Sequence, residues 1–499
     1  MGRKHRRKTV VRKAEPAGPA AVSPRWRFFV WMSSFFAFAT LFLRLDVITA
    51  WPGAEGWALG AAVFSDSATY FPVWLAERLL PLGESFGGQV DRVWLPARLV
   101  SAVAMLATAI VTYLAGRRLF GREATTLGLL CAAASLYLPF FGKVATGDAL
   151  ALLGHTGLYF LGLLYLLDTE SKRPPVAAVA CGLLGAVVAP VATILIALAL
   201  LLADRSTGRG RWIAVGLLVA CVGSRLLGDY ELFRYTSTPL ELGRFGRFLG
   251  YCLLGSAPII GWLFAGLRDL VYKVRRGEQA GRLLAVGLGL SLLAQSLLFP
   301  LLLAFVAGKQ MQLYFRSDIR YPWGNYVKTG SVLHLITAFI GAFLALAGGA
   351  IAFPGAGFRA GLGMVAAYWI FSLFGVLGIF GERRDFALGG SLLSGLLAAL
   401  FFWVQVYPYF ELERAWPKQL VRQLEGSLGA GAQVQVDAQS EDASALSVAV
   451  PYLLRAGFRV DPVDGPELRA VELEDSTVVL SPEVDGRIVF GRRRFGLAE

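Results

Sequence analysis

The chain has 499 residues, of which 56% are hydrophobic and only 17% are charged. With a mean hydropathy of +0.57, this composition excludes a water-soluble protein and predicts a membrane protein. The net charge of +13 does not indicate nucleic-acid binding, because seven basic residues lie in the first thirteen positions and others lie in short loops. Such a distribution orients a membrane protein with its basic segments in the cytoplasm.

Ten apolar runs are long enough to cross a bilayer. They lie at about 26–45, 93–115, 124–141, 149–167, 212–228, 248–272, 282–307, 331–353, 361–380 and 387–407. A further run, 175–203, has Pro190 near its middle and basic residues at both ends, which favours a helical hairpin over one crossing. Counting that hairpin as two predicts twelve spans.

Residues 1–25 form a basic segment that we expect in the cytoplasm, and residues 26–410 form the predicted transmembrane domain. The loop 46–91 mixes aromatic and charged residues, which is typical of helices lying on the membrane surface. The tail, 411–499, alternates apolar and polar residues around one helix-like stretch, which predicts a small α/β domain. The predicted fold class is therefore an all-α polytopic membrane protein of about 12–13 transmembrane helices, with a small C-terminal α/β domain.

The basic loops do not all agree with twelve spans. With the N-terminus inside, the basic segments 116–122 and 273–282 fall inside as well, but 309–328 and 381–386 fall outside. Twelve spans put the tail inside, whereas one further crossing puts it outside. We favour the outer, periplasmic side for the tail, because 381–386 is then cytoplasmic.

Four charged residues are candidates for chemistry. Asp148 stands at the start of the run 149–167, where it either caps the helix or acts as a base on the outer face. Glu55 lies in the first outer loop, about ten residues past the first span. Arg98 and Lys309 lie near the ends of spans, where each either anchors the span at the interface or binds an anion.

A histidine and the cysteines also lie in the predicted membrane domain, but their positions do not indicate catalysis. His155, two turns after Asp148, is expected to be a packing residue that forms hydrogen bonds, rather than a catalyst. Cysteine occurs singly within apolar runs, at Cys131, Cys181, Cys221 and Cys252. These cysteines predict neither a disulfide framework nor a metal site.

The order of these pieces resembles the membrane glycosyltransferases of the GT-C fold, in the branch of the protein O-mannosyltransferases and lipid A aminoarabinose transferases. The stretch LPARLVSAVAMLATAIVTYLAGRRLF and the turn ATGD carry the resemblance. It is best over about 93–167 and extends more loosely over about 26–410. It implies an enzyme of the inner (cytoplasmic) membrane that moves a sugar from a polyprenyl-phosphate donor to a lipid, polysaccharide or protein acceptor on the outer face.

The resemblance also implies roles for the candidate residues. Asp148 falls on the family's aspartate in the second outer loop, Arg98 on the arginine of an ARLPS-like stretch, and Lys309 on the lysine of an SxxKLPxY-like loop. Glu55 or Asp148 then acts as the base. Arg98 and Lys309 neutralise the phosphate, a role that a divalent metal ion can also fill; no metal ligands and no other cofactor are predicted.

The chain departs from the family at three places. The family's Asp-Glu pair is Ala54-Glu55 here, a Lys-Pro pair is replaced by Ser67 and Ala68, and a Lys-Gly pair is replaced by Ala189-Pro190. Two alternatives therefore stay open: a catalytically degenerate member that acts as an assembly partner, and a polytopic transporter or flippase. The position of most charges at span ends favours an enzyme over a transporter.

Overall fold

A computed structural model of the chain describes most of its membrane domain and a small part of its tail. The described residues are 24–43, 45, 89–144, 146–167, 175–203, 211, 213, 215–217, 242–316, 321–352, 356–407, 433–437 and 459–463. The loop 46–91 is therefore described only from residue 89 onward. Glu55, Ala54, Ser67 and Ala68 lie outside the described residues.

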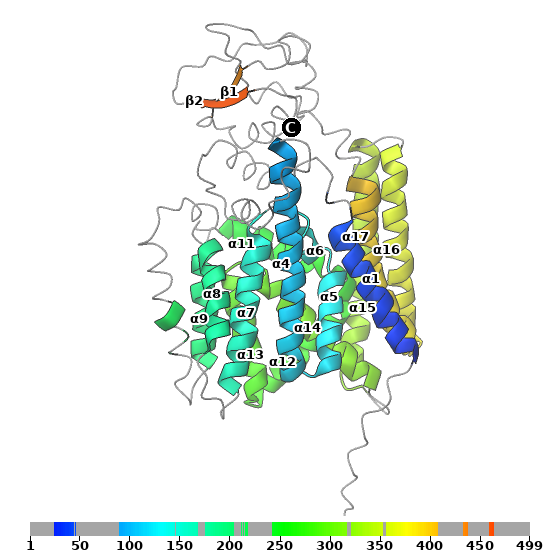
Figure 1. Ribbon diagram of the computed structural model, residues 1–499. Helices are drawn as coiled ribbons and strands as arrows, with labels where there is room; N and C mark the ends of the chain where they lie inside the picture. Colours follow the sequence, from blue (N-terminus) through cyan, green and yellow to red (C-terminus); the bar gives the residue numbers. More distant parts are fainter. Residues whose placement is uncertain are drawn as a thin grey trace, which may run out of the picture.

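The described residues of the membrane domain form a bundle of helices around a large apolar core, with smaller apolar clusters beside it (Figure 1). Twelve helices of this part of the chain have 13 or more residues and run along the bundle: α1 (Pro24–Phe42), α4 (Gln89–Leu119), α5 (Arg122–Ala134), α7 (Asp148–Leu167), α8 (Val176–Val188), α9 (Pro190–Ala203), α12 (Ile260–Arg275), α13 (Gln279–Leu293), α14 (Leu298–Arg316), α15 (Gly324–Ala352), α16 (Ala356–Phe380) and α17 (Arg384–Phe401). The predicted all-α polytopic fold class is confirmed.

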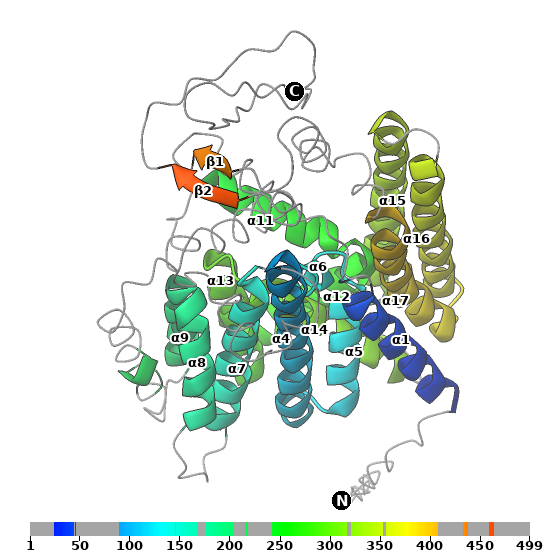
Figure 2. The ribbon, with the colours of Figure 1, turned by 45° about the horizontal axis from the view of Figure 1, so that its top comes forward.

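The shorter elements lie at the ends of the bundle helices. The four-residue helix α6 (Leu138–Phe141) precedes α7, the 3₁₀ helix η3 (Ala257–Ile259) precedes α12, and the π-helical turn η4 (Phe402–Val406) follows α17. Helix α11 (Leu242–Gly255) meets α12 at a bend of 56°, and Figure 2 shows it lying across one end of the bundle.

By length and hydropathy, six of the described helices can each cross a membrane, or seven if the bent α11–α12 pair counts as one span. Four more apolar helices are shorter than a full span, among them α8 and α9. Several of the runs counted as spans in the sequence thus form helices of only 13–15 residues, about 20 Å long at the usual helical rise.

Helices α8 and α9 form the predicted hairpin. Gly154 and Gly157 of α7 lie against Gly185 and Cys181 of α8, so these two helices are antiparallel. In α9, Thr193 and Leu200 lie against His155 and Gly162 of α7 in the same order, so α9 runs parallel to α7. The turn lies at Ala189, directly before Pro190, because proline cannot continue the hydrogen bonding of α8.

The apolar run 282–307 was predicted as one span, and this prediction is wrong. Within it, α13 ends at Leu293 and α14 begins at Leu298. Gln295 between them has a φ of 49°, in the left-handed region that ends a helix. The chain therefore reverses inside this run, which contributes two helices to the bundle instead of the one span that was predicted.

The additional helix brings the basic segments to one end of the bundle. Arg316 at the end of α14 pairs with Glu123 at the start of α5, and Arg384 at the start of α17 donates to the carbonyl of Phe315 at 3.0 Å. The segments 116–122, 273–282 and 381–386 thus share one end, as the positive-inside rule requires. We call it the basic end, and the opposite end the Asp148 end.

The described residues that directly follow α17 lie at the Asp148 end. Trp403, just past α17, packs against Phe140 of α6, with 6.0 Å between the ring centroids. Two tail strands are described, β1 (Gln433–Asp437) and β2 (Arg459–Val463), which pair in parallel with Gln433 opposite Arg459. Parallel strands need a crossover connection, and the residues between β1 and β2, like most of the predicted α/β domain, lie outside the described ones.

Candidate functional site

Asp148 is the first residue of α7, and its side chain is half-buried at the end of the bundle. The negative charge there suits the positive end of the helix dipole, so the helix fixes the carboxylate at this position. Around it, Ala149, Leu150 and Ala151 are buried against Val100 of α4 and Val188 of α8. The carboxylate thus stands where three helices meet.

Arg98 lies in α4 and is almost completely buried, with 2% of its surface exposed. Its Nη1 donates a hydrogen bond to the carbonyl oxygen of Leu45, just past α1, at 3.3 Å. Of the two roles that the sequence allows for Arg98, an anchor facing the membrane interface does not agree with so buried a guanidinium. Its five donors suit binding of a phosphate or carboxylate.

Lys143 is a second buried cation at this end, and sequence reasoning did not single it out. It lies in the turn between α6 and α7 and has 3% of its surface exposed. Its Nζ donates a hydrogen bond to the carbonyl oxygen of Leu43 and lies 5.2 Å from the ring centroid of Trp403. The signal was present in the sequence: a lysine at the end of an apolar run, five residues before Asp148.

The structure brings Arg98, Lys143 and Asp148 to the same end of the bundle. Ser101, one turn after Arg98, donates a hydrogen bond of 3.4 Å to the carbonyl of Thr146, two residues before Asp148. Arg98 and Lys143 donate to carbonyls only two residues apart in the chain, a span of at most about 7 Å. One carboxylate and two cations therefore share this site.

The structure does not bring Lys309 to this site. Lys309 lies beside Leu119, Phe120 and Lys273 at the basic end. From Ser101, which contacts the Asp148 turn, α4 continues for 18 residues to Leu119, about 27 Å at the helical rise. The sequence did not show that Lys309 lies at the basic end. Helix α14 begins at the Asp148 end, and Lys309 lies eleven residues further along this helix.

His155 is a packing residue, as expected. Its Nδ1 is 2.8 Å from the hydroxyl of Ser296 and its Nε2 is 3.0 Å from the hydroxyl of Thr193. Both ring nitrogens are thus engaged by other helices, and the residue is 1% exposed. These hydrogen bonds tie α7 to α9 and to the turn before α14, and they leave the ring no free nitrogen for catalysis.

Residues that hold metal ions do not cluster in the described part of the chain. No group of three or more His, Cys, Asp or Glu side chains lies close enough there to hold a metal ion. Among the described residues, the two buried cations are Arg98 and Lys143, and both lie at the Asp148 end.

Neither a family model nor a curated protein sequence matches this chain. Among solved structures, it is similar to the crystal structure of ArnT from Cupriavidus metallidurans bound to undecaprenyl phosphate, with a TM-score of 0.58 and 16% identity over 88% of this chain and 86% of that one. The apo structure of the same ArnT gives a TM-score of 0.57, at 15% identity over 87% and 85% of the two chains. These likenesses show that the chain has the GT-C-like membrane fold predicted from its sequence.

Proposed function

We propose that this protein is a membrane glycosyltransferase, which moves a sugar from a polyprenyl-phosphate donor to a lipid, polysaccharide or protein acceptor. The observation that carries the proposal is that Asp148 and the buried cations Arg98 and Lys143 lie at the same end of the bundle. The fold supports it, because the ArnT of the same fold was crystallised with undecaprenyl phosphate.

The reaction needs a base and a group that neutralises phosphate. An acceptor hydroxyl or amine gives its proton to a carboxylate, and its oxygen or nitrogen forms the new bond to the anomeric carbon of the sugar. The bond between that carbon and the phosphate oxygen breaks, and the electron pair leaves with the polyprenyl phosphate. Inversion at the anomeric carbon follows from this direct displacement.

In this proposal Arg98 and Lys143 bind the departing phosphate, whose negative charge grows as the bond breaks. Asp148 or Glu55 takes the proton; Asp148 stands in the described site, and Glu55 lies outside the described residues. Lys309 has no part in this step, because it lies at the other end of the bundle.

We place the protein in the inner (cytoplasmic) membrane, with the basic end in the cytoplasm and the Asp148 end outside. This placement is supported by the basic segments, which lie together at one end of the bundle. The positive-inside rule assigns that end to the cytoplasm. The tail, which follows the turn η4 at the Asp148 end, is then periplasmic.

The proposal is tested by transfer of radiolabelled sugar from polyprenyl-phosphate donors in membranes that contain the wild-type protein or the Asp148→Asn variant. We expect transfer by the wild type and a loss of at least about 100-fold in the variant, the size of a general-base contribution. Asp385→Asn is the matched control, since Asp385 also lies in the first turn of a helix, α17, but at the basic end. Equal transfer by wild type and Asp148→Asn would exclude the role of Asp148.

A catalytically degenerate protein that acts as an assembly partner is the second candidate, and Ala54 favours it. The family resemblance implies an aspartate at this position, whereas alanine cannot accept a proton. The Ala54→Asp variant separates the two candidates in the same transfer assay. Transfer that rises in the variant indicates a weakened enzyme, and no transfer by either protein indicates the assembly partner.

A further inference from the structure

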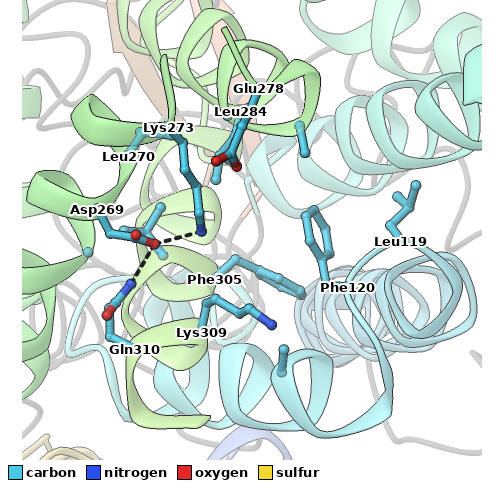
Figure 3. Close-up of a pocket in the computed structure, with 15 residues that line it drawn as sticks. Leu119, Phe120, Asp269, Leu270, Lys273, Glu278, Leu284, Phe305, Lys309 and Gln310 are labelled. Carbon is cyan, nitrogen blue, oxygen red and sulfur yellow. Dashed lines mark hydrogen bonds and ion pairs between the residues drawn. The ribbon is translucent and has the colours of Figure 1, made fainter. Parts of the chain in front are cut away.

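A cavity of about 250 Å³ lies at the basic end, away from Asp148. Its walls come from the end of α4, the start of α5, and helices α12, α13 and α14 (Figure 3). The volume is below the ~300–1,000 Å³ typical of pockets for drug-sized ligands. The cavity thus fits a small polar group, such as a lipid headgroup, better than a whole lipid.

One carboxylate of the cavity is already neutralised. Asp269 of α12 forms an ion pair with Lys273 at 2.7 Å, and it accepts a hydrogen bond from Nε2 of Gln310 at 3.0 Å. The Oε1 of Gln310 in turn accepts a bond from the hydroxyl of Tyr321 at 2.6 Å. These groups satisfy one another, so they form a fixed polar wall.

Lys309 differs from Lys273 in its partner. Its Nζ donates to Oε1 of Gln312 at 2.8 Å, and that acceptor is neutral. The nearby acid Glu123 is held by two hydrogen bonds of 2.6 Å from Arg316. Within the described residues, no carboxylate lies at ion-pair distance from Lys309, which is half-buried. A half-buried cation without an acid partner is suited to bind an anion.

A second carboxylate, besides Asp269, lines the same cavity. Glu278 lies in the turn between α12 and α13 and is exposed. Figure 3 shows the Glu278 carboxylate and the Lys309 ammonium on two sides of the cavity. Phe120, Phe305 and Leu284 line the cavity with apolar surface. The cavity therefore offers a positive site, a negative site and an apolar wall.

We infer that this cavity binds an amine-bearing phosphate ester of the phosphoethanolamine type, with the phosphate on Lys309 and the amine on Glu278. The shared chemistry occurs in a membrane phospholipid and in a free, soluble headgroup. The phosphate pairs with the ammonium of Lys309, and the amine pairs with the carboxylate of Glu278. This inference concerns the end of the bundle opposite the proposed transfer site, so it stands independently of the glycosyltransferase proposal.

The test measures lipid binding to the full-length protein in detergent by native mass spectrometry. The probes are dioleoyl phosphatidylethanolamine and dioleoyl phosphatidylglycerol, which share a phosphate but differ in the amine. We expect Lys309→Gln to weaken binding of both lipids about tenfold, the effect of losing one charge-assisted contact. Glu278→Gln should weaken phosphatidylethanolamine alone and so remove the preference for it.

Two further variants keep the result interpretable. Lys328→Gln removes a cation near the start of α15 that does not line the cavity, and it should leave binding unchanged. Leu284→Trp fills the cavity without altering either charge, and it should weaken binding of both lipids. Thermal unfolding of each variant shows that the protein is folded.

Competition with soluble phosphoethanolamine identifies the source of the ligand. Displacement of the lipid by the soluble compound indicates that the headgroup alone is sufficient for binding. Failure to displace the lipid indicates that the acyl chains are needed. Both results agree with a binding site in this cavity. Folded Lys309→Gln and Leu284→Trp variants that bind as the wild type does would overturn the inference. A preference for phosphatidylethanolamine that persists in Glu278→Gln would overturn the amine assignment.

Discussion

The ammonium group of Lys143 lies 5.2 Å from the ring centroid of Trp403. This contact joins the turn before α7 to the residues that follow α17, although 260 positions separate the two side chains in the chain. A cation over an indole ring is stabilised by the ring's negative face. Trp403 thus helps to hold Lys143 at the same end of the bundle as Asp148, where the proposed phosphate site lies.

The first prediction concerns this cation. Lys143→Met keeps the length of the side chain but removes its charge, so we expect the KM for the polyprenyl-phosphate donor to rise about tenfold or more. Lys143→Arg should retain most of the donor affinity, because it retains the charge. Initial transfer rates at varied donor concentration measure both effects. An unchanged KM in a folded Lys143→Met protein would remove Lys143 from the donor site.

The second prediction concerns the neutralisation of phosphate. A phosphate monoester leaving group carries up to two negative charges, and Arg98 and Lys143 together supply two positive charges at the Asp148 end. We therefore expect transfer to persist when EDTA is added to the assay. Activity that disappears with EDTA and returns with Mg²⁺ would assign the phosphate to a divalent ion instead.

Much of the fold was predictable from the sequence, because hydropathy directly reflects the solvent around a helix. The hairpin at Pro190 was predictable as well, since proline and flanking basic residues mark its turn and ends. The run 282–307 was misread because its turn uses Gln295 and Ser296 instead of Gly or Pro. Two polar residues in the middle of a 26-residue apolar run are the signal that was missed.

The candidate site was predictable only in part. Asp148 and Arg98 lie at the ends of their apolar runs, so the direction of each span was enough to place them at one end. Lys309 also follows an apolar run, yet that run contains the undetected turn, and the reversal of direction moved Lys309 to the basic end. Lys143 was missed although its position five residues before Asp148 was visible, because its contact with Trp403 joins residues 260 positions apart.

The third prediction concerns the packing of α7 on α8. A Cβ atom at Gly154 would lie 2.6 Å from the Cα of Gly185 and 2.8 Å from the carbonyl oxygen of Cys181, which are backbone atoms that cannot move aside. Gly154→Ala should therefore separate the two helices and lower the free energy of unfolding by about 1–3 kcal/mol, the usual cost of overpacking.

The control for this packing prediction is Gly289→Ala in α13. A Cβ atom there meets no atom within 4 Å, and alanine favours a helix over glycine by about 1 kcal/mol. This variant should be as stable as the wild type or slightly more stable. Thermal unfolding in detergent compares the two. Equal stability of Gly154→Ala and the wild type would mean that α7 and α8 are less closely packed than described.

The last prediction concerns the ion pair between Glu123 and Arg316 at the basic end. Burial opposes ionisation of the Glu123 carboxyl, but hydrogen bonds from Arg316 and Gln312 outweigh it and hold its pKa below the ordinary value of 4.5. A carboxyl with a depressed pKa in the folded state stabilises the protein above the ordinary value, and this stabilisation is lost as the pH falls through the lower, folded-state pKa. Because the side chain of Arg316 is 55% exposed, the contribution is at most about 1 kcal/mol. The measurement is the melting temperature of each protein from pH 7 down to pH 3. It should fall less steeply in Glu123→Gln than in the wild type. Equal slopes in the two proteins would show that this ion pair contributes nothing to acid sensitivity.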